Sequence, residues 1–247
     1  SGLWLIDPVN ITTGAAGSNI LASTVSTALN SGSVTISTSG GTGGIGTYTS
    51  GPTGSQTTTD QAGAAGAGDI TVSSAISKTA GGDSTLTLLA DRNITVNAPI
   101  TSTSGALNLK LSAANNTSTG TLGGVLITSN IQSNGGNILI GGAGGNNQTA
   151  QTLKNGIGYA RNYSASMAAV TIDPLTANSV SVKSNGGNIT INGYSTTDPS
   201  GNGDGSGVHV KAGSVIDSGY YVGTSTTSSA GGNINISGYA VGANNQF

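Results

Sequence analysis

Cysteine and glutamate are both absent from this 247-residue chain, and only 6% of its residues are charged. Without cysteine, the chain has neither disulfide bonds nor thiolate chemistry. Packed helices usually draw on Glu, Lys, Leu and Ala in a 3.6-residue pattern, but every acidic residue here is Asp. The composition therefore argues against helices over most of the chain.

Basic residues are also scarce, because the seven Lys and Arg are scattered along a chain whose formal net charge is −2. Binding to a nucleic acid backbone relies on clustered positive charge, so no nucleic acid partner is expected. No run approaches the roughly 20 apolar residues of a membrane-spanning helix. Residues 1–8 lack the basic and hydrophobic regions of a signal peptide, which is typical of a mature product or of a piece of a longer protein.

Glycine and short β-branched runs dominate what is present. The chain has 42 Gly, yet 34% of its residues are hydrophobic. Ile, Val and Thr are stiff at χ1 and suit a pleated surface, so their short alternating runs predict strands. The polar stretches between these runs predict turns.

Internal repeats are the strongest signal in the sequence. Three segments share a Gly-Gly-Asn-Ile-x-Ile pattern: residues 133–142, 184–193 and 229–238. Their asparagines, Asn137, Asn188 and Asn233, are 51 and 45 positions apart. A shorter version recurs at Asp69 and Asn93, 24 positions apart, and the longer spacings are about twice this one. A unit near 24 residues cannot bury its own apolar face, which is typical of one coil of a solenoid.

One such unit divides into three short strands, at residues 93–96, 98–101 and 107–111. Apolar and polar residues alternate along each strand, so one set of side chains faces a common interior. The inward set is Ile94, Val96, Ile100, Leu107, Leu109 and Leu111, and the preceding unit supplies Ile70, Val72, Ile76, Leu86 and Leu88. Stacked coils would pair equivalent strands in parallel, at about 4.8 Å, with Gly, Asn or Asp at corners that need positive φ.

The predicted fold is therefore all-β: a right-handed parallel β-helix with three short strands per coil, in a single continuous domain over residues 1–247. Three irregular stretches, near 40–68, 143–167 and 196–207, are too long for corners and are expected to loop out of the rod. Neither a charged cap nor an amphipathic capping helix is evident at the termini, which favours coils that continue or join at the ends.

Several motifs follow one another in a recognisable order. They are Leu3-Trp-Leu-Ile-Asp-Pro8, Asn10-Ile-Thr12, Gly68-Asp-Ile-Thr-Val-Ser73, Ile76-Ser-Lys-Thr-Ala-Gly-Gly82, Leu86-Thr-Leu88, Asp91-Arg-Asn-Ile94 and Ile131-Gln-Ser-Asn-Gly-Gly-Asn137. This order resembles the β-helix repeat region of filamentous haemagglutinin-like large exoproteins, the two-partner secretion adhesins of bacteria. The resemblance spans most of the chain, and the order of the motifs carries it, since each motif alone is of low complexity.

The resemblance implies export through the outer membrane by a dedicated transporter, a parallel β-helix, and a role as an adhesin, a fibre or a toxin-delivery stalk. The amino-terminal secretion domain of that family, with its Asn-Pro-Asn signatures, is not visible here, so this export route follows from similarity alone. The resemblance supplies no residue-level binding site.

An enzyme is the main alternative from another class, because parallel β-helices include polysaccharide lyases and hydrolases. Glycoside hydrolysis needs two carboxylates roughly 5 to 10 Å apart. Asp69, Asp83 and Asp91 lie near expected corners and are the candidates. Asp69 takes the position that Asn93 has one coil later, which favours a corner role shared by Asp and Asn over catalysis.

Metal and cofactor sites are not expected either. His209 is the only histidine, and it alternates with valines in a way that predicts an outward-facing strand residue. Residues 201–205, Gly-Asn-Gly-Asp-Gly, resemble a calcium-binding turn, but a single copy with one acid favours a solvated loop. We therefore predict no catalytic, metal-binding or cofactor-binding residues.

Aromatic residues are the candidates for contact with a partner. Six tyrosines could stack on sugars or pack against another subunit, and could equally cap the core where a loop leaves the rod: Tyr159, Tyr163, Tyr194, Tyr220, Tyr221 and Tyr239. Trp4 and Phe247 are candidates for an end-to-end junction, although Trp4 is also typical of a core residue. Sequons in expected loops, at Asn116, Asn147 and Asn162, are candidates for glycosylation.

Three functional hypotheses follow from these residues and patterns. The first is a structural or adhesive module at the bacterial surface, whose partner is a glycan or protein of a host or neighbouring cell. The second is an extracellular fibre subunit that binds copies of itself through its coil ends. The third, an enzyme acting on polysaccharide, would require a groove lined by two or more Asp.

Overall fold

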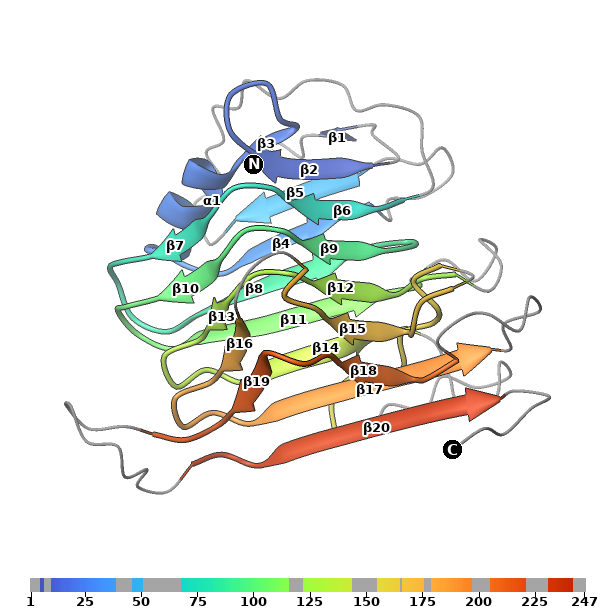
Figure 1. Ribbon diagram of the computed structural model, residues 1–247. Helices are drawn as coiled ribbons and strands as arrows, with labels where there is room; N and C mark the ends of the chain where they lie inside the picture. The colour runs from blue at the N-terminus through green and yellow to red at the C-terminus, as the bar shows by residue number, and fades with distance from the viewer. Residues whose placement is uncertain are drawn as a thin grey trace.

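The computed structural model describes residues 5–6, 10–38, 46–50, 68–115, 122–143, 155–164, 166–175, 179–196, 205–220 and 231–241. In these residues the chain winds as a parallel β-helix with three sheets, in which the parallel strands of successive coils stack one upon another (Figure 1). The predicted all-β solenoid with three short strands per coil is confirmed.

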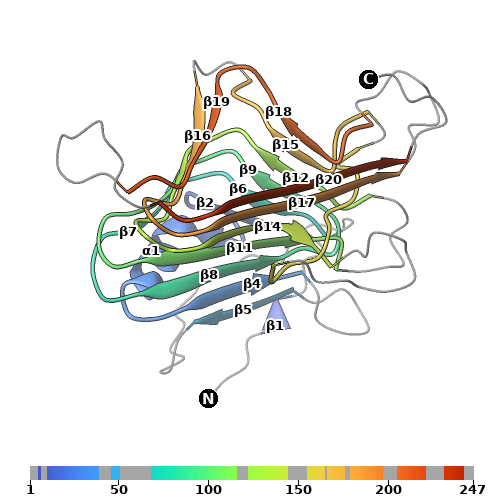
Figure 2. The same cartoon turned by 90° about the horizontal axis from the view of Figure 1, so that it is seen from below.

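Each regular coil contributes one strand to each of three sheets, named here sheets A, B and C (Figure 2). In spatial order, sheet A contains β1 (Leu5–Ile6), β5 (Gly46–Ser50), β4 (Val34–Ser37), β8 (Ser84–Leu89), β11 (Leu107–Ala113), β14 (Ile138–Gly142), β17 (Ile189–Thr196) and β20 (Ile234–Val241). Sheet B contains β3 (Ile20–Leu21), β2 (Ile11–Gly14), β6 (Ile70–Val72), β9 (Ile94–Val96), β12 (Val125–Ile127), β15 (Val170–Ile172) and β18 (Val208–Val210). Sheet C contains β7 (Ile76–Lys78), β10 (Ile100–Ser102), β13 (Ile131–Gln132), β16 (Val180–Lys183) and β19 (Ser214–Asp217).

The core is a set of apolar ladders that run through the stack. In sheet A, Leu109 lies in register between Leu86 and Ile138, and all three side chains are at most 1% exposed. Polar residues between them point outward, as the alternation along β8 and β11 predicts. Because burial of each such side chain contributes about 1.5 to 3 kcal/mol, these ladders are the main stabilising feature of the rod.

The long repeat spacings also span single coils. β14 pairs directly with β17, with Ile138 opposite Ile189, and β17 pairs with β20, with Ile189 opposite Ile234. The interpretation that the 51- and 45-residue spacings are twice the coil length is therefore wrong. Extra residues between two strands of a ladder cost little, because the entropy of loop closure grows slowly with loop length.

Two of the expected excursions return in part to sheet A. Within 40–68, β5 pairs antiparallel with β4. Within 143–167, residues 157–160 insert between the end of β14 and the second half of β17: the amide of Gly142 donates to Gly158 O at 3.2 Å, and that of Ala160 donates to Asn192 O at 3.0 Å. These segments satisfy sheet edges that the regular strands leave open. For the third excursion, residues 197–204 lie outside the described part.

A short helix covers the first coil, where no capping helix was predicted. Helix α1 (Ala22–Leu29) takes the place of the sheet C strand and packs beside β7, burying Ala22, Val25 and Leu29. The hydroxyl of Ser26 accepts the amide of Ser77 at 2.9 Å, and Asn30 Oδ1 accepts two further amides just after β7. The expectation that the amino-terminal coil lacks a cap is therefore wrong.

Buried polar groups line the corner between sheets C and A. In four successive coils, a serine at the end of the sheet C strand or just after it donates its hydroxyl to the carbonyl oxygen of a following glycine: Ser102 to Gly105 at 2.9 Å, Ser133 to Gly136 at 2.6 Å, Ser184 to Gly187, and Ser218 to Gly232 at 2.6 Å. In β7, fully buried Lys78 lies in register with Ser102. Its ammonium donates to the carbonyls of Ala80 at 2.7 Å, Gly81 at 3.3 Å and Ser104 at 2.5 Å.

Candidate functional site

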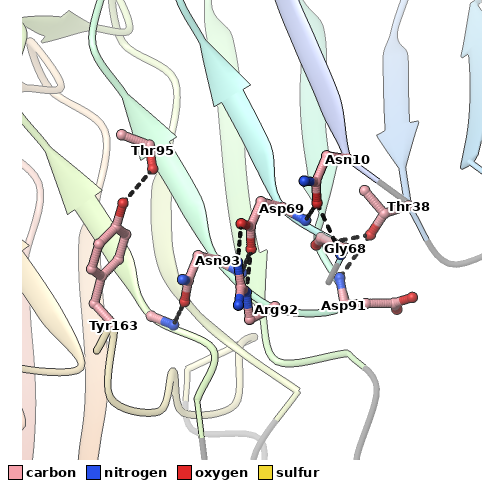
Figure 3. A network of polar contacts seen from close by, with 10 residues as sticks. Asn10, Thr38, Gly68, Asp69, Asp91, Arg92, Asn93, Thr95 and Tyr163 are labelled. Atoms are coloured by element: carbon pink, nitrogen blue, oxygen red, sulfur yellow. Dashed lines mark hydrogen bonds and ion pairs between the residues drawn. The ribbon is translucent and has the colours of Figure 1, made fainter. Parts of the chain in front are cut away.

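The corner between sheets A and B carries a network in which one side chain per coil holds the next coil (Figure 3). Asn10 Oδ1 accepts the backbone amides of Gly68 at 3.1 Å and Asp69 at 2.9 Å. Asp69 Oδ1 accepts the amide of Asn93 at 3.0 Å, and Asn93 Oδ1 accepts that of Gly124 at 2.9 Å. The predicted corner role, shared by Asp and Asn, is confirmed.

An ion pair closes this network on the outside. Arg92 donates to both carboxylate oxygens of Asp69, from Nε at 2.7 Å and from Nη2 at 2.5 Å. The hydrogen bond from Arg92 to Asp69 raises the pKa of the guanidinium above its ordinary value, against the opposing effect of partial burial. The carboxylate of Asp69 is therefore engaged by a guanidinium and by a backbone amide of the next coil.

The other two candidate acids also contact neighbouring coils. Asp83 Oδ1 accepts the amide of Ala106 at 2.8 Å. The backbone amide of Asp91 donates to Thr38 Oγ1 at 2.8 Å, and this hydroxyl donates to Gly68 O at 3.2 Å (Figure 3). Each of the three predicted carboxylate positions thus takes part in coil-to-coil contacts.

A second ion pair lies near the carboxy-terminal end of sheet B. Asp173, just after β15, accepts Lys211 Nζ at 2.6 Å, and its Oδ1 accepts the amide of Leu175 at 2.8 Å. His209, in the middle of β18, adds a favourable charge interaction with Asp173. Burial would raise the pKa of Asp173, but the hydrogen bonds from Lys211 and Leu175 outweigh it, so this pKa is lowered.

This lowered pKa predicts a stability change in acid. Because the pKa of Asp173 is lower in the folded state than in the unfolded state, its ion pair contributes to stability above the ordinary carboxyl pKa. This contribution is lost as the pH falls through the folded-state pKa. The Lys211 side chain is 42% exposed and its charge is screened, so the contribution is below about 1 kcal/mol. We expect Asp173→Asn to lower the urea midpoint at pH 7 and to flatten its fall between pH 5 and 3. An unchanged pH profile in the variant would contradict this role.

Three of the six predicted contact tyrosines gather on sheet A. Tyr239 of β20 lies opposite Tyr194 of β17, with ring centroids 6.4 Å apart. The ring of Tyr159 meets Tyr239 edge to face at 5.6 Å. Tyr159 and Tyr194 are buried, whereas Tyr239 is 45% exposed. We name Tyr159, Tyr194 and Tyr239 the tyrosine cluster; it offers one exposed ring that contacts two buried ones.

Polar groups hold this cluster in place. Desolvation by burial raises the pKa of Tyr159, as does the charge interaction with Tyr239, while a hydrogen bond with Ser237 opposes the rise. The backbone amide of Tyr194 donates to Ala160 O at 2.8 Å, which ties the inserted segment to β17. Two of the three rings thus pack inward and one faces solvent.

The remaining predicted residues lie elsewhere. Tyr163 exchanges a hydrogen bond with Thr95 Oγ1 at 2.8 Å (Figure 3), and Tyr220 is 48% exposed beside Gly186. Asn162 is 4% exposed and its amide donates to Ser195 Oγ at 3.2 Å, so a sugar there would have to be attached before folding. The predicted positions outside the described residues are Trp4, Phe247, Tyr221, Asn116 and Asn147.

Sequence reasoning missed the two ion pairs, the buried ammonium of Lys78 and the hydroxyls beside it. A signal existed for the buried lysine. Lys78 follows Ile76 by two positions, so the strand alternation that places Ile76 inside also places Lys78 inside. The ion pairs had no comparable signal, because Arg92 and Asp69 meet only through stacking of two coils.

No family model, curated protein or solved structure matches the chain. Within the described residues, no group of three or more His, Cys, Asp or Glu side chains is placed to hold a metal ion. In the same part of the chain, no helix is long and apolar enough to span a membrane.

Proposed function

We propose that this chain is a structural and adhesive module of a secreted bacterial surface protein, in which a rigid β-helical rod presents side groups for attachment. The observation that carries this proposal is the uninterrupted parallel stack: five successive strands of sheet C pair in register from β7 to β19. Backbone hydrogen bonds along the axis stiffen such a rod. The resemblance to two-partner secretion exoproteins supports the extracellular location and the outer-membrane transporter.

The tyrosine cluster is the contact that we assign to adhesion. Tyr239 presents a ring that is 45% exposed, and Tyr159 and Tyr194 support it from beneath. A tyrosine offers an apolar face for stacking and a hydroxyl for hydrogen bonding, at a low cost in side-chain entropy. A glycan of a host or neighbouring cell, which has apolar C–H faces between its hydroxyls, fits such a ring.

Adhesion of beads coated with the full chain tests this proposal. We expect the beads to attach to cultured epithelial cells or to neighbouring bacteria, and treatment of those cells with glycosidases to reduce attachment. Tyr239→Ala should reduce attachment about tenfold, which corresponds to about 1.4 kcal/mol. Tyr220→Ala is the matched control, because Tyr220 is similarly exposed but lies outside the cluster.

Two outcomes would count against the proposal. Beads that attach to no cell type would remove the adhesive role. Equal attachment by the wild-type chain and Tyr239→Ala would remove the tyrosine cluster as the contact, provided that both chains show the same thermal midpoint.

An end-to-end fibre is the second candidate, and the exposure of Ile234 and Ile236 in β20, the last strand of the described residues, favours it. A head-to-tail fibre needs a second open face, but α1 and β5 cover the amino-terminal side of the described coils. Negative-stain microscopy at rising chain concentration separates the two candidates, because only the fibre produces filaments.

A further inference from the structure

The carboxy-terminal side of the stack exposes side chains that belong to the core. β18, β19 and β20 are the outermost strands of their sheets (Figures 1 and 2). Ile234 is 43% exposed and Ile236 is 48% exposed, while their partners Ile189 and Ile191 are fully buried. In sheet B, Val210 is 39% exposed opposite buried Ile172. We call the surface made by β18, β19 and β20 the end face.

A ladder of asparagines reaches the end face. Asn108 Oδ1 accepts the amide of Asn137 at 3.0 Å, and Asn137 Oδ1 accepts that of Asn188 at 2.9 Å. Asn188 Oδ1 then accepts the amide of Asn233 at 2.8 Å. Asn233 is the last member of this ladder in the described residues. Its exposed side chain occupies the position at which each earlier asparagine accepts a backbone amide of the next coil.

A ladder of glycines sets how closely the next coil approaches. A Cβ on Gly187 would lie 2.2 Å from Gly136 O, and a Cβ on Gly232 would lie 2.1 Å from Gly187 O. Real Cβ atoms essentially never come this close to a backbone oxygen, so the coils that contain Gly187 and Gly232 require glycine at this position. The end face therefore specifies the residues of a coil that would cover it: glycine, then a residue whose amide meets Asn233, then alternating apolar residues.

We propose that the end face is a docking surface for one further parallel coil whose strand carries the pattern Gly-Gly-Asn-apolar-polar-apolar. The proposal rests on continuity with the β14–β17 and β17–β20 interfaces, whose register, amide contacts and close glycine approach it repeats. A second copy joined about a twofold axis would bring β20 against β20 in antiparallel order, which reproduces neither ladder. The inference does not depend on the adhesive role, and the two contacts compete, because a docked coil would also cover Tyr239 of β20.

A synthetic peptide with the sequence of residues 229–241 tests this proposal on the full chain. Hydrogen exchange measured by mass spectrometry should show about tenfold slower exchange of the β20 amides in the presence of this peptide, because its strand covers their free edge. A second peptide, carrying G232A, should protect them at least tenfold less. The exchange of β8 and β11 amides serves as the internal reference.

The variant Asn233→Ala tests the same contact from the side of the chain. Its backbone amide still donates to Asn188, so the fold is retained, while the acceptor for the incoming coil is lost. We expect about tenfold weaker peptide binding by fluorescence anisotropy. Asn235→Ala, at an exposed position two residues along the same strand, should bind as the wild type does.

Three results would overturn the proposal. The first is no protection of β20 at millimolar peptide. The second is equal binding of the wild-type and G232A peptides to the unaltered chain, which would show association without the glycine register. This result does not depend on whether Asn233→Ala folds. The third is protection of β20 that rises with chain concentration alone, which would assign the end face to a second copy.

Discussion

Gly187→Ala is expected to lower the free energy of unfolding by about 3 kcal/mol. A methyl group at this position would lie 2.2 Å from Gly136 O and 2.8 Å from Gly135 O. Both atoms are backbone, so neither can rotate away as a flexible side chain would. The coils must instead separate locally, which weakens the amide contact between Asn137 and Asn188 and the adjoining pairs of β14 and β17.

Urea denaturation followed by far-ultraviolet circular dichroism measures this change. Gly82→Ala is the matched control, since Gly82 is an exposed corner glycine whose added Cβ would meet nothing within 4 Å. The control should change stability by less than about 0.5 kcal/mol. If both variants unfold at the same urea concentration, close backbone approach at the corner is not what selects glycine.

Lys78→Met is expected to lower the free energy of unfolding by about 2 kcal/mol. The methionine side chain fills much of the same buried volume, but it cannot donate to the carbonyls of Ala80, Gly81 and Ser104. Charge-assisted hydrogen bonds of this kind are roughly twice as strong as neutral ones. Their loss outweighs the gain from no longer burying an ammonium group, because the corner carbonyls are left without that donor.

The matched control is Lys110→Met. Lys110 is a partly exposed outward residue of β11, and its replacement should change the urea midpoint little. Equal or greater stability of Lys78→Met would show instead that desolvation of the ammonium costs more than its three hydrogen bonds return.

The sequence was most informative where local pattern and tertiary contact agree. Ile94 and Val96 alternate with Thr95, and this alternation alone places both apolar side chains inside. The shared position of Asp69 and Asn93 correctly indicated a corner role, because both side chains offer an oxygen that accepts an amide from the next coil. These inferences needed only the period of the strand and the chemistry of one residue type.

Helix α1 shows where composition was a poor guide. Ser and Thr dominate its surface, but Ala22, Val25 and Leu29 are spaced as on one face of a helix and are all buried. Intrinsic propensity predicts little when an apolar face can pack. Here packing beside β7, with amide contacts from Ser26 and Asn30, stabilises a segment that would be a poor helix in isolation.

By itself, the sequence determined the strand period, the repeated corner residues and therefore the class of fold. Those features act over a few neighbouring residues, so they can be read without knowing which coils touch. Only the tertiary structure decided that the 51- and 45-residue spacings are single coils, that Tyr159 and Tyr194 support Tyr239, and that Ile234 and Ile236 are exposed. These features depend on contacts between segments far apart in the chain. Excursions of variable length separate those segments in the sequence, so the sequence does not reveal the register that the side-chain ladders impose.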